Sequence, residues 1–283
     1  MSEKGRNIDS GGDCPYKDLH IYYIEGCLMP GSDDRFGDSY LGDWEEEGTS
    51  FLFFSRPEDD IISRLLSDQP GLVLHDSYQM AWKDWQARFP DMVEIGGFAF
   101  AAPWFGGETP RGKIRLTLDP GVVFGTGTHP TTAHCIEALE EVFAGDPPEK
   151  VLDLGCGTGI LALAAKSLGA KTVTAVDLNP LAARTTKANV ALNGMEESVA
   201  VVHGRAENWV DRPADLLMAN IHAAVLKELV SHPGFARKKT VILSGLLRSQ
   251  VGEIRDAVKS LPFKIKREWS CDGTWFTLLC QKT

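Results

Sequence analysis

A glycine-rich loop that follows a carboxylate is the part of this chain whose residue types and spacing most clearly suggest chemistry. The sequence V-L-D-L-G-C-G-T-G places Gly155, Gly157 and Gly159 shortly after Asp153. Glycine lets a backbone approach a ligand without a side chain in between, and a short apolar run before such a loop predicts a buried strand, a tight turn and a helix. A dinucleotide loop would need its third glycine where Ile160 stands. Because Asp153 would repel a phosphate, we expect a ligand without phosphate that carries a cationic or amine group.

A second carboxylate, Asp177, ends the next predicted strand, residues 171–178. An acidic residue at this point of a nucleotide-binding sheet accepts hydrogen bonds from the ribose hydroxyls. One hydrogen bond to a charged group contributes roughly 1.5–3 kcal/mol, enough to orient an adenosine. Asp177 could instead cap the next helix, but Asn179 and Pro180 already provide a cap and a first helical residue. We therefore interpret Asp177 as the ribose ligand.

The pattern D-x-G-x-G-x-G resembles the cofactor loop of class I methyltransferases, in which S-adenosylmethionine lies across the ends of the strands. The resemblance implies this cofactor and assigns the three glycines of the loop to its binding site. An ordinary glycine turn between a strand and a helix is the alternative interpretation.

A second distinctive run is D-P-G-V-V-F-G-T-G-T-H-P-T-T at residues 119–132, in which two glycines, four threonines and a proline follow Phe124. The apolar spacing after it predicts a helix that begins near Pro130, with unpaired N–H groups in its first turn. Such a helix start can bind the carboxylate of a methionine moiety. Phe124 could cover the sulfonium, a contact that contributes roughly 0.5–2 kcal/mol. Two alternatives stay open: His129 is either a general base or a structural residue, and the threonines could serve only as caps.

Asn220 ends the predicted strand 214–221, where a transferred methyl group would project. Its side-chain amide can accept a hydrogen bond from an incoming amine and aim the nitrogen lone pair at the methyl group. Positioning of this kind can lower a barrier by roughly 7–11 kcal/mol at best, without a base. We therefore predict Asn220 to be the catalytic residue. It could also cap a helix that begins at His222, and the two roles are compatible.

Alternating strands and helices in the second half of the chain indicate an α/β fold, with a parallel sheet covered on both faces and ligands above the carboxyl ends of its strands. The predicted strands are 151–154, 171–178, 199–203, 214–221, 240–244, 263–267 and 275–280, and the predicted helices begin near 130 and span 160–168, 180–192 and 247–259.

The first part of the chain predicts a smaller unit. Residues 1–18 are polar and glycine-rich, and we expect them to be disordered. We divide the rest into a small α+β substrate-recognition domain at 19–78, a linker and junction at 79–112 and the catalytic domain at 113–283. Within these parts we expect strands at 19–24, 51–54, 72–75, 98–102 and 113–118, a helix at 57–67, a loop at 31–48, and a short helix at 81–89 that carries Trp82, Trp85 and Phe89 on one face.

Composition narrows the class of function. A chain of 283 residues that is 43% hydrophobic can bury one sizeable core and a smaller second one. Its net charge of -10 argues against direct nucleic-acid binding and favours a basic partner. The six cysteines lack C-x-x-C pairs, which favours free thiols in the cytoplasm. The seven histidines show no metal-ligand spacing, and we expect no metal, membrane span or signal peptide.

With these residues in view, the chain resembles the PrmA family, bacterial methyltransferases of a large-subunit ribosomal protein. The resemblance runs from about residue 82 to the end and rests on the run at 119–132 and on D-L-G-C-G-T-G-I-L-A, A-V-D-L-N-P, A-N-I and I-L-S-G-L-L. It implies a seven-stranded, Rossmann-like methyltransferase domain behind a small N-terminal substrate domain, with Thr132, Gly155, Asp177 and Asn220 as cofactor contacts. His222 stands where the family usually has an apolar residue.

The resulting hypothesis is in-line methyl transfer from S-adenosylmethionine to amines of a ribosomal protein, an N-terminal α-amine, lysines or both. We expect a cytoplasmic monomer. Deprotonation at neutral pH costs roughly 4–5 kcal/mol for a lysine and about 1–1.5 kcal/mol for an α-amine, so the α-amine is the easier substrate. The alternatives are the same chemistry on another protein, a small molecule or RNA, and a cofactor-binding module without catalysis.

Overall fold

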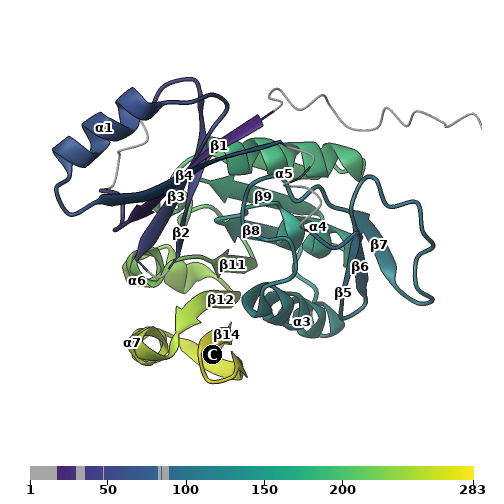
Figure 1. Ribbon diagram of the computed structural model, residues 1–283. Helices are drawn as coiled ribbons and strands as arrows, with labels where there is room; N and C mark the ends of the chain where they lie inside the picture. The colour runs from purple at the N-terminus through teal and green to yellow at the C-terminus, as the bar shows by residue number, and fades with distance from the viewer. Residues whose placement is uncertain (1–17, 30–35, 47, 82–83, 85–88) are drawn as a thin grey trace, which may run out of the picture.

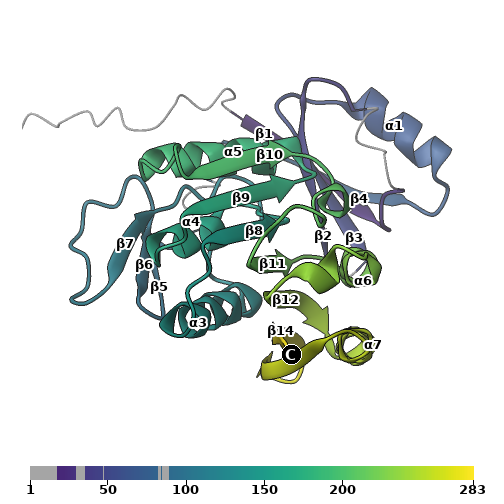
Figure 2. The ribbon, with the colours of Figure 1, turned by 180° about the vertical axis from the view of Figure 1, so that it is seen from behind.

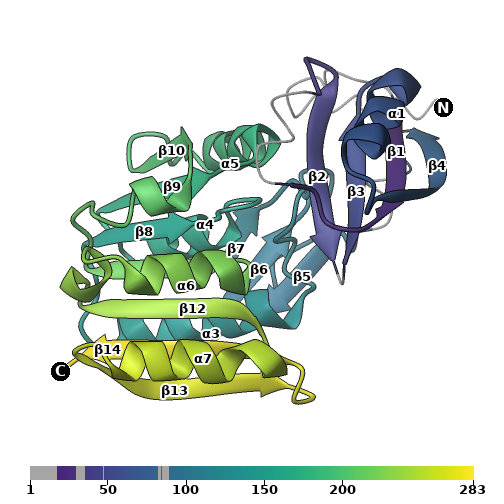
Figure 3. The ribbon, with the colours of Figure 1, turned by 90° about the vertical axis from the view of Figure 1, so that its left-hand side faces the viewer.

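The computed structural model describes residues 18–29, 36–46, 48–81, 84 and 89–283, with the backbone alone at 44–46, and it arranges them in three β-sheets (Figure 1). A seven-stranded sheet forms the centre, and a four-stranded sheet built from the first part of the chain stands beyond one end of its strands (Figure 3). The segment 1–17 of the predicted disordered stretch, and both tryptophans of the helix predicted at 81–89, lie outside the described residues.

The central sheet has the strand order β10-β9-β8-β11-β12-β14-β13. Neighbours are parallel from β10 to β12, whereas β14 is antiparallel to both β12 and β13. The predicted seven-stranded α/β fold is therefore confirmed. The strands are β8 (Lys150–Leu154), β9 (Thr172–Asp177), β10 (Val199–His203), β11 (Leu216–Asn220), β12 (Thr240–Leu247), β13 (Phe263–Cys271) and β14 (Trp275–Lys282).

Helices cover both faces of this sheet, as expected for a parallel sheet whose strands are apolar on both sides. Apolar side chains of α3, α4 and α5 belong to the core on one face, and those of α6 and α7 to the core on the other (Figures 2 and 3). The helices are α3 (Pro130–Ala144), α4 (Ile160–Ser167), α5 (Pro180–Leu192), α6 (Ala223–Ser231) and α7 (Arg248–Lys259), with short 3-10 turns η2 (Ala206–Asn208) and η3 (Phe235–Arg237).

A three-stranded sheet, β5 (Met92–Ile95), β6 (Phe98–Ala101) and β7 (Ile114–Thr117), packs against the side of the central fold that carries α3 and α4. Two side-chain amides, one in α5 and one just after its last residue, anchor the chain that leaves β7. Asn193 Oδ1 accepts from the Thr117 amide at 2.9 Å, and Asn189 Oδ1 accepts from the Asp119 amide at 2.7 Å. The run that begins at Asp119 therefore leaves this small sheet from a fixed position.

The four-stranded sheet has the order β2-β3-β1-β4, from β1 (Asp18–Glu25), β2 (Tyr40–Glu46), β3 (Thr49–Phe54) and β4 (Val73–Ala81). Helix α1 (Asp59–Asp68) buries Ile62 and Leu65 against one face. The other face packs on the central fold, because Ile21 and Phe53 share a buried cluster with Val122 and Leu181.

Two predictions in this region are wrong. The segment 31–48 is not a continuous loop, since β2 occupies residues 40–46. The sequence does not indicate this strand because it is acidic and contains a bulge. At the bulge β2 advances by two residues, Leu41 and Gly42, while β3 advances by one, which breaks the alternation of inward and outward side chains. The last strand of the N-terminal sheet was predicted at 72–75 but is longer, because β4 continues to Ala81.

Candidate active site

The glycine loop lies between β8 and α4, as predicted, and its glycines are in the left-handed region, with φ of +76° at Gly155, +56° at Gly157 and +83° at Gly159. Close packing adds a second reason for glycine. A Cβ at Gly157 would lie 2.3 Å from the carbonyl oxygen of Phe124, and one at Gly155 would lie 2.0 Å from a methyl carbon of Ile221. The loop is thus pressed between the run at 119–132 and the end of β11.

Asp177 ends β9 next to this loop. Its Oδ2 accepts from the Gly157 amide and its Oδ1 from the Asn179 amide, both at 2.9 Å. Burial raises the pKa of Asp177, while those two amides and the nearby His203 act in the opposite direction. The capping role belongs to Asn179, whose Oδ1 accepts from the Leu181 amide at 2.8 Å. Each carboxylate oxygen can accept more than one hydrogen bond, so Asp177 keeps acceptor capacity for a ligand.

Asp153, which was expected near the loop, is buried beneath it with 1% of its surface exposed. Neither carboxylate oxygen has a hydrogen-bond partner of normal geometry among the described residues. Burial, and then the negative charge of Asp177, raise the pKa of Asp153 to about 7, against a smaller opposing effect of the Ala162 amide. Because the Asp153 carboxyl keeps its proton up to about pH 7, the negative charge that suits a cationic ligand at the base of the site is that of Asp177.

The run at 119–132 lies against the glycine loop and leads into α3. The Thr158 amide donates to the Phe124 carbonyl at 3.1 Å, and Thr158 Oγ1 donates to the Gly125 carbonyl at 2.6 Å. The Phe124 side chain is 40% exposed and is therefore available to a ligand. Thr132, on the first turn of α3, is fully buried, and its hydroxyl has no partner among the described residues. An unpaired buried hydroxyl at a helix start fits a polar ligand group.

His129, not a threonine, is the N-cap of α3. Its Nδ1 accepts from the Thr131 amide at 3.3 Å and lies 2.7 Å from Thr131 Oγ1. Its ring meets those of Phe124 and Trp275 edge to face, with centroids 5.3 and 4.9 Å apart. Burial lowers the pKa of His129, and the proximity of His134 lowers it further. The imidazole is thus held neutral between two aromatic rings.

Asn220 is half-buried at the carboxyl end of β11. The order β9-β8-β11 places Asp177 and Asn220 on the two strands that flank β8 and its glycine loop. Asn220 does not cap α6, because that helix has His222 at its N-cap position and no side-chain cap bond. The predicted site residues therefore meet at one edge of the sheet, and the capping alternative for Asn220 is excluded.

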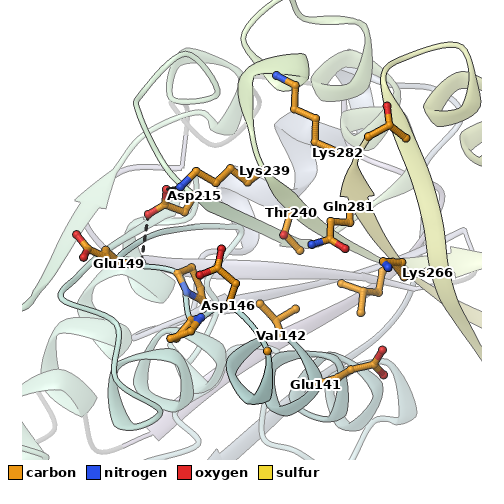
Figure 4. A pocket seen from close by; sticks show the side chains of 15 residues that line it. Glu141, Val142, Asp146, Glu149, Asp215, Lys239, Thr240, Lys266, Gln281 and Lys282 are labelled. Carbon is orange, nitrogen blue, oxygen red and sulfur yellow. Dashed lines mark hydrogen bonds and ion pairs between the residues drawn. The ribbon is translucent and has the colours of Figure 1, made fainter.

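A large cavity lies elsewhere. It has a volume of about 730 Å³ and is lined by residues near the amino ends of β8 and β12 and by the end of the chain, including Glu149, Lys239 and Thr283 (Figure 4). An ion pair of 2.8 Å between Lys239 and Asp215 lies on its wall. This cavity is at the opposite end of the strands from Asp177 and Asn220, so it is separate from the predicted site.

These features define the class of the protein: a Rossmann-like fold whose parallel sheet ends in an antiparallel pair, with a glycine loop after β8 and a carboxylate at the end of β9, is that of a class I methyltransferase. The family model described as "Ribosomal protein L11 methyltransferase (PrmA)" matches residues 64–283, and the chain belongs to this family. It is an enzyme that uses S-adenosylmethionine to methylate its substrate.

Comparison with individual relatives supports this family membership. Proteins named ribosomal protein L11 methyltransferase are 36% identical over 242 residues in Shewanella sediminis, covering 81% of each chain, and 32% identical over 272 residues in Streptococcus pyogenes, covering 89% of this chain and 84% of the relative. A crystal structure of a ribosomal protein L11 methylase from Lactobacillus delbrueckii subsp. bulgaricus is similar with a TM-score of 0.59 and 29% identity, and covers 69% of this chain and 100% of that one. No helix in the described part of the chain has the length and apolarity needed to cross a bilayer.

Sequence reasoning missed Trp275 as a neighbour of the site. The signal was present only in the topology: because β14 runs antiparallel to β12, its first residue, Trp275, pairs with Leu247 at the end of β12. The start of β14 is thereby brought to the edge at which the other strands end.

Proposed function

We propose that this chain transfers methyl groups to amine nitrogens of ribosomal protein L11, on the N-terminal α-amine, on lysine side chains or on both. The observation that carries the proposal is the meeting of the glycine loop, Asp177 and Asn220 at one edge of the sheet, in a chain of this family. The relatives are named for ribosomal protein L11, which suggests the target, and the chemistry of the site fits an amine.

The residues at this edge fit S-adenosylmethionine part by part. In the proposal, Asp177 accepts hydrogen bonds from the ribose hydroxyls, and the backbone of Gly155, Gly157 and Gly159 forms the floor. The methionine carboxylate lies toward the start of α3, where the buried Thr132 hydroxyl lacks a partner in the described structure. The exposed Phe124 ring faces the sulfonium. The cofactor, when bound, supplies a methyl group on a positively charged sulfur.

Asn220 then orients the acceptor. Its side-chain oxygen accepts a hydrogen bond from the amine N–H, which points the nitrogen lone pair along the line toward the methyl group. A neutral amine is required, and burial lowers the pKa of an amine because it disfavours the charged form. Positioning accounts for the catalysis in this scheme, so no side chain needs to form a covalent bond to the substrate.

The geometry of His129 argues against the general-base alternative. Its Nδ1 lies 3.3 Å from the Thr131 amide nitrogen and 2.7 Å from Thr131 Oγ1, so this nitrogen is engaged by the first turn of α3. We assign His129 to the cap of α3 and to holding the rings of Phe124 and Trp275 in place.

Charge distribution supports a substrate-recognition role for the first domain, with the boundaries 19–78, 79–112 and 113–283 that the sequence suggests. Residues 18–81 contain 14 Asp and Glu against three Arg and no Lys, whereas the rest of the chain has 25 acidic and 26 basic residues. The net negative charge of the protein therefore resides in this one part. A strongly acidic surface attracts a basic protein and accelerates its docking.

We further propose that the enzyme works in the cytoplasm as a monomer without binding nucleic acid directly. Support for the compartment comes from the cysteines: Cys135, Cys156, Cys271 and Cys280 are free thiols, in keeping with a reducing environment. The acidic net charge supports the absence of direct nucleic-acid binding.

Incubation of the purified chain with methyl-labelled S-adenosylmethionine and unmethylated ribosomal protein L11 tests the proposal. We expect label on the protein and mass increments of 14 on an amine, located by peptide mass spectrometry. Ribosomal RNA and a small amine acceptor, offered in parallel, test the alternatives. Label that enters only the RNA or the small amine would overturn the target, and cofactor binding without transfer to any acceptor would overturn the catalytic role.

A further inference from the structure

The acidic first domain contacts the cofactor side of the enzyme at one unusually close point. Strand β2 lies against α5, and Gly42 in its bulge packs on the side chain of Asn179. A Cβ at Gly42 would lie 2.5 Å from Nδ2 and 3.0 Å from Oδ1 of Asn179. Only a glycine leaves room for this approach, and its φ of +147° also favours glycine.

Asn179 is hydrogen-bonded to Asp177, the carboxylate that we propose binds the ribose. Its backbone amide donates to Asp177 Oδ1 at 2.9 Å, and its side-chain Oδ1 accepts from the Leu181 amide at 2.8 Å. The position of Asn179 therefore sets both the direction of the Asp177 carboxylate and the first turn of α5. A group that pushes on the Asn179 side chain displaces the amide whose Oδ1 caps α5, next to the backbone amide that donates to Asp177.

The same domain also touches the opposite wall of the site. Its side chains Ile21, Leu41 and Phe53 are buried together with Leu181, in the first turn of α5, and with Val122. Val122 lies two residues before Phe124, whose carbonyl accepts from the Thr158 amide of the glycine loop. One face of the four-stranded sheet thus packs on both segments that flank the proposed cofactor.

We propose that Gly42 and Asn179 are positioning residues through which the seating of the N-terminal domain controls the affinity for S-adenosylmethionine. Seated on Asn179, the four-stranded sheet holds Asp177 in the direction that binds the ribose. When the sheet is displaced, Asn179 and the start of α5 lose that support and the cofactor is bound more weakly. By linkage, any protein that favours the seated position of this domain raises the affinity for the cofactor by the same factor as the cofactor raises the affinity for that protein.

The inference rests on the proposed role of Asp177, and its test is a calorimetric titration of the full chain with S-adenosylhomocysteine. Gly42→Ala places a methyl group against Asn179. We expect the dissociation constant of this variant for S-adenosylhomocysteine to rise roughly fivefold or more, which is the lower end of typical coupling between sites. Gly48→Ala is the matched control, because Gly48 also has a positive φ, +81°, in the turn between β2 and β3, and a Cβ there would have no neighbour within 4 Å among the described residues.

A double variant separates the contact from backbone strain. Serine at 179 keeps an N-cap oxygen but lacks the outer amide atoms that a Cβ at residue 42 would meet. Gly42→Ala should therefore weaken binding less in a chain that already carries Asn179→Ser than in the unsubstituted chain, although residue 42 keeps its strained φ in both. Thermal unfolding and circular dichroism establish that each variant is folded.

The outcomes are distinct. Equal affinities for Gly42→Ala and Gly48→Ala, or an effect of Gly42→Ala that is the same with and without Asn179→Ser, would overturn the coupling while leaving the proposed function in place. Failure of the unsubstituted chain to bind S-adenosylhomocysteine would overturn both.

Discussion

The Gly157 amide donates a 2.9 Å hydrogen bond to Oδ2 of Asp177, and this bond joins the loop after β8 to the carboxyl end of β9. The loop that would form the floor under the cofactor and the carboxylate that would hold its sugar are therefore one unit. A change to either residue alters the geometry of the other, which makes both suitable for testing the site.

Asp177→Asn should weaken binding of S-adenosylhomocysteine by roughly tenfold to a hundredfold, the equivalent of one lost hydrogen bond to a charged group. The amide keeps the size of the side chain but removes its charge. It also turns an NH2 group toward one of the two backbone amides that now donate to the carboxylate. Calorimetry measures the affinity, and Asp256→Asn, at an exposed position of α7, is the control. An unchanged affinity in Asp177→Asn would show that Asp177 does not bind the ribose.

Asn220→Ala should reduce kcat by roughly a hundredfold or more, because the acceptor amine loses its orienting partner. The stability should change little, since His222 and not Asn220 is the N-cap of α6. Single-turnover methylation of ribosomal protein L11 measures the chemical step. His222→Ala is the control next to the site and should keep most of the activity. A variant at 220 with normal kcat would show that another group orients the amine.

Stability should fall as the pH rises from 4 to 7, because of Asp153. Its carboxyl keeps a proton in the folded protein up to about pH 7, whereas an aspartate in the unfolded chain loses its proton near pH 3.9. Between these values the folded state binds more protons than the unfolded state, so the free energy of unfolding decreases with pH by up to about 4 kcal/mol and is constant above pH 7. Urea unfolding of the wild type and of Asp153→Asn at pH 5 and pH 8 measures the effect. We expect the variant to gain stability relative to the wild type at pH 8, and an identical pH dependence of the two proteins would contradict the prediction.

The acidic first domain should make recognition of a basic protein salt-dependent. Raising the ionic strength from about 0.05 to 0.3 M should increase the KM for ribosomal protein L11 several-fold and leave the KM for S-adenosylmethionine nearly unchanged, since screening weakens attraction between surface charges. Charge reversal at two exposed positions, Asp38→Lys with Asp60→Lys, should raise the KM for the protein in the same way. Asp256→Lys, on α7, reverses a charge outside this domain and should have little effect. Equal effects of both reversals would mean that docking does not depend on the first domain.

The residues of the proposed site could be predicted from the sequence because each stands at the end of a regular element. An apolar strand, a glycine loop and a helix follow one another at residues 151–168, and Asp177 and Asn220 close two further apolar runs. Parallel strands bring such ends to one edge, so local patterns were sufficient to collect them. The α6 capping alternative for Asn220 could be decided only by the structure, in which His222 takes that position.

Contacts between distant elements could not be predicted in this way. The close approach of Gly42 to Asn179 depends on a bulge in an acidic strand that lacks the usual alternation, and the sequence suggested a loop there. Trp275 reaches the site only because β14 reverses direction beside β12. In both cases the signal lies in how two strands pair, which a single sequence does not contain.

Gly157→Ala should abolish detectable cofactor binding and lower the free energy of unfolding by more than backbone strain alone. A Cβ at this position meets the Phe124 carbonyl oxygen at 2.3 Å, a backbone atom that cannot rotate away, and φ is +56°. The loop must shift, which breaks the bond to Asp177 and moves the run that carries Phe124. Gly194→Ala is the matched control: Gly194 has a φ of +63° after α5, and a Cβ there would have no neighbour within 4 Å. We expect the control to lose about 1 kcal/mol of stability from its strained φ and to bind S-adenosylhomocysteine normally. The difference between the two variants, measured by urea unfolding and calorimetry, isolates the contact with Phe124. Similar losses of stability and of affinity in both variants would contradict the expected clash with the Phe124 carbonyl oxygen.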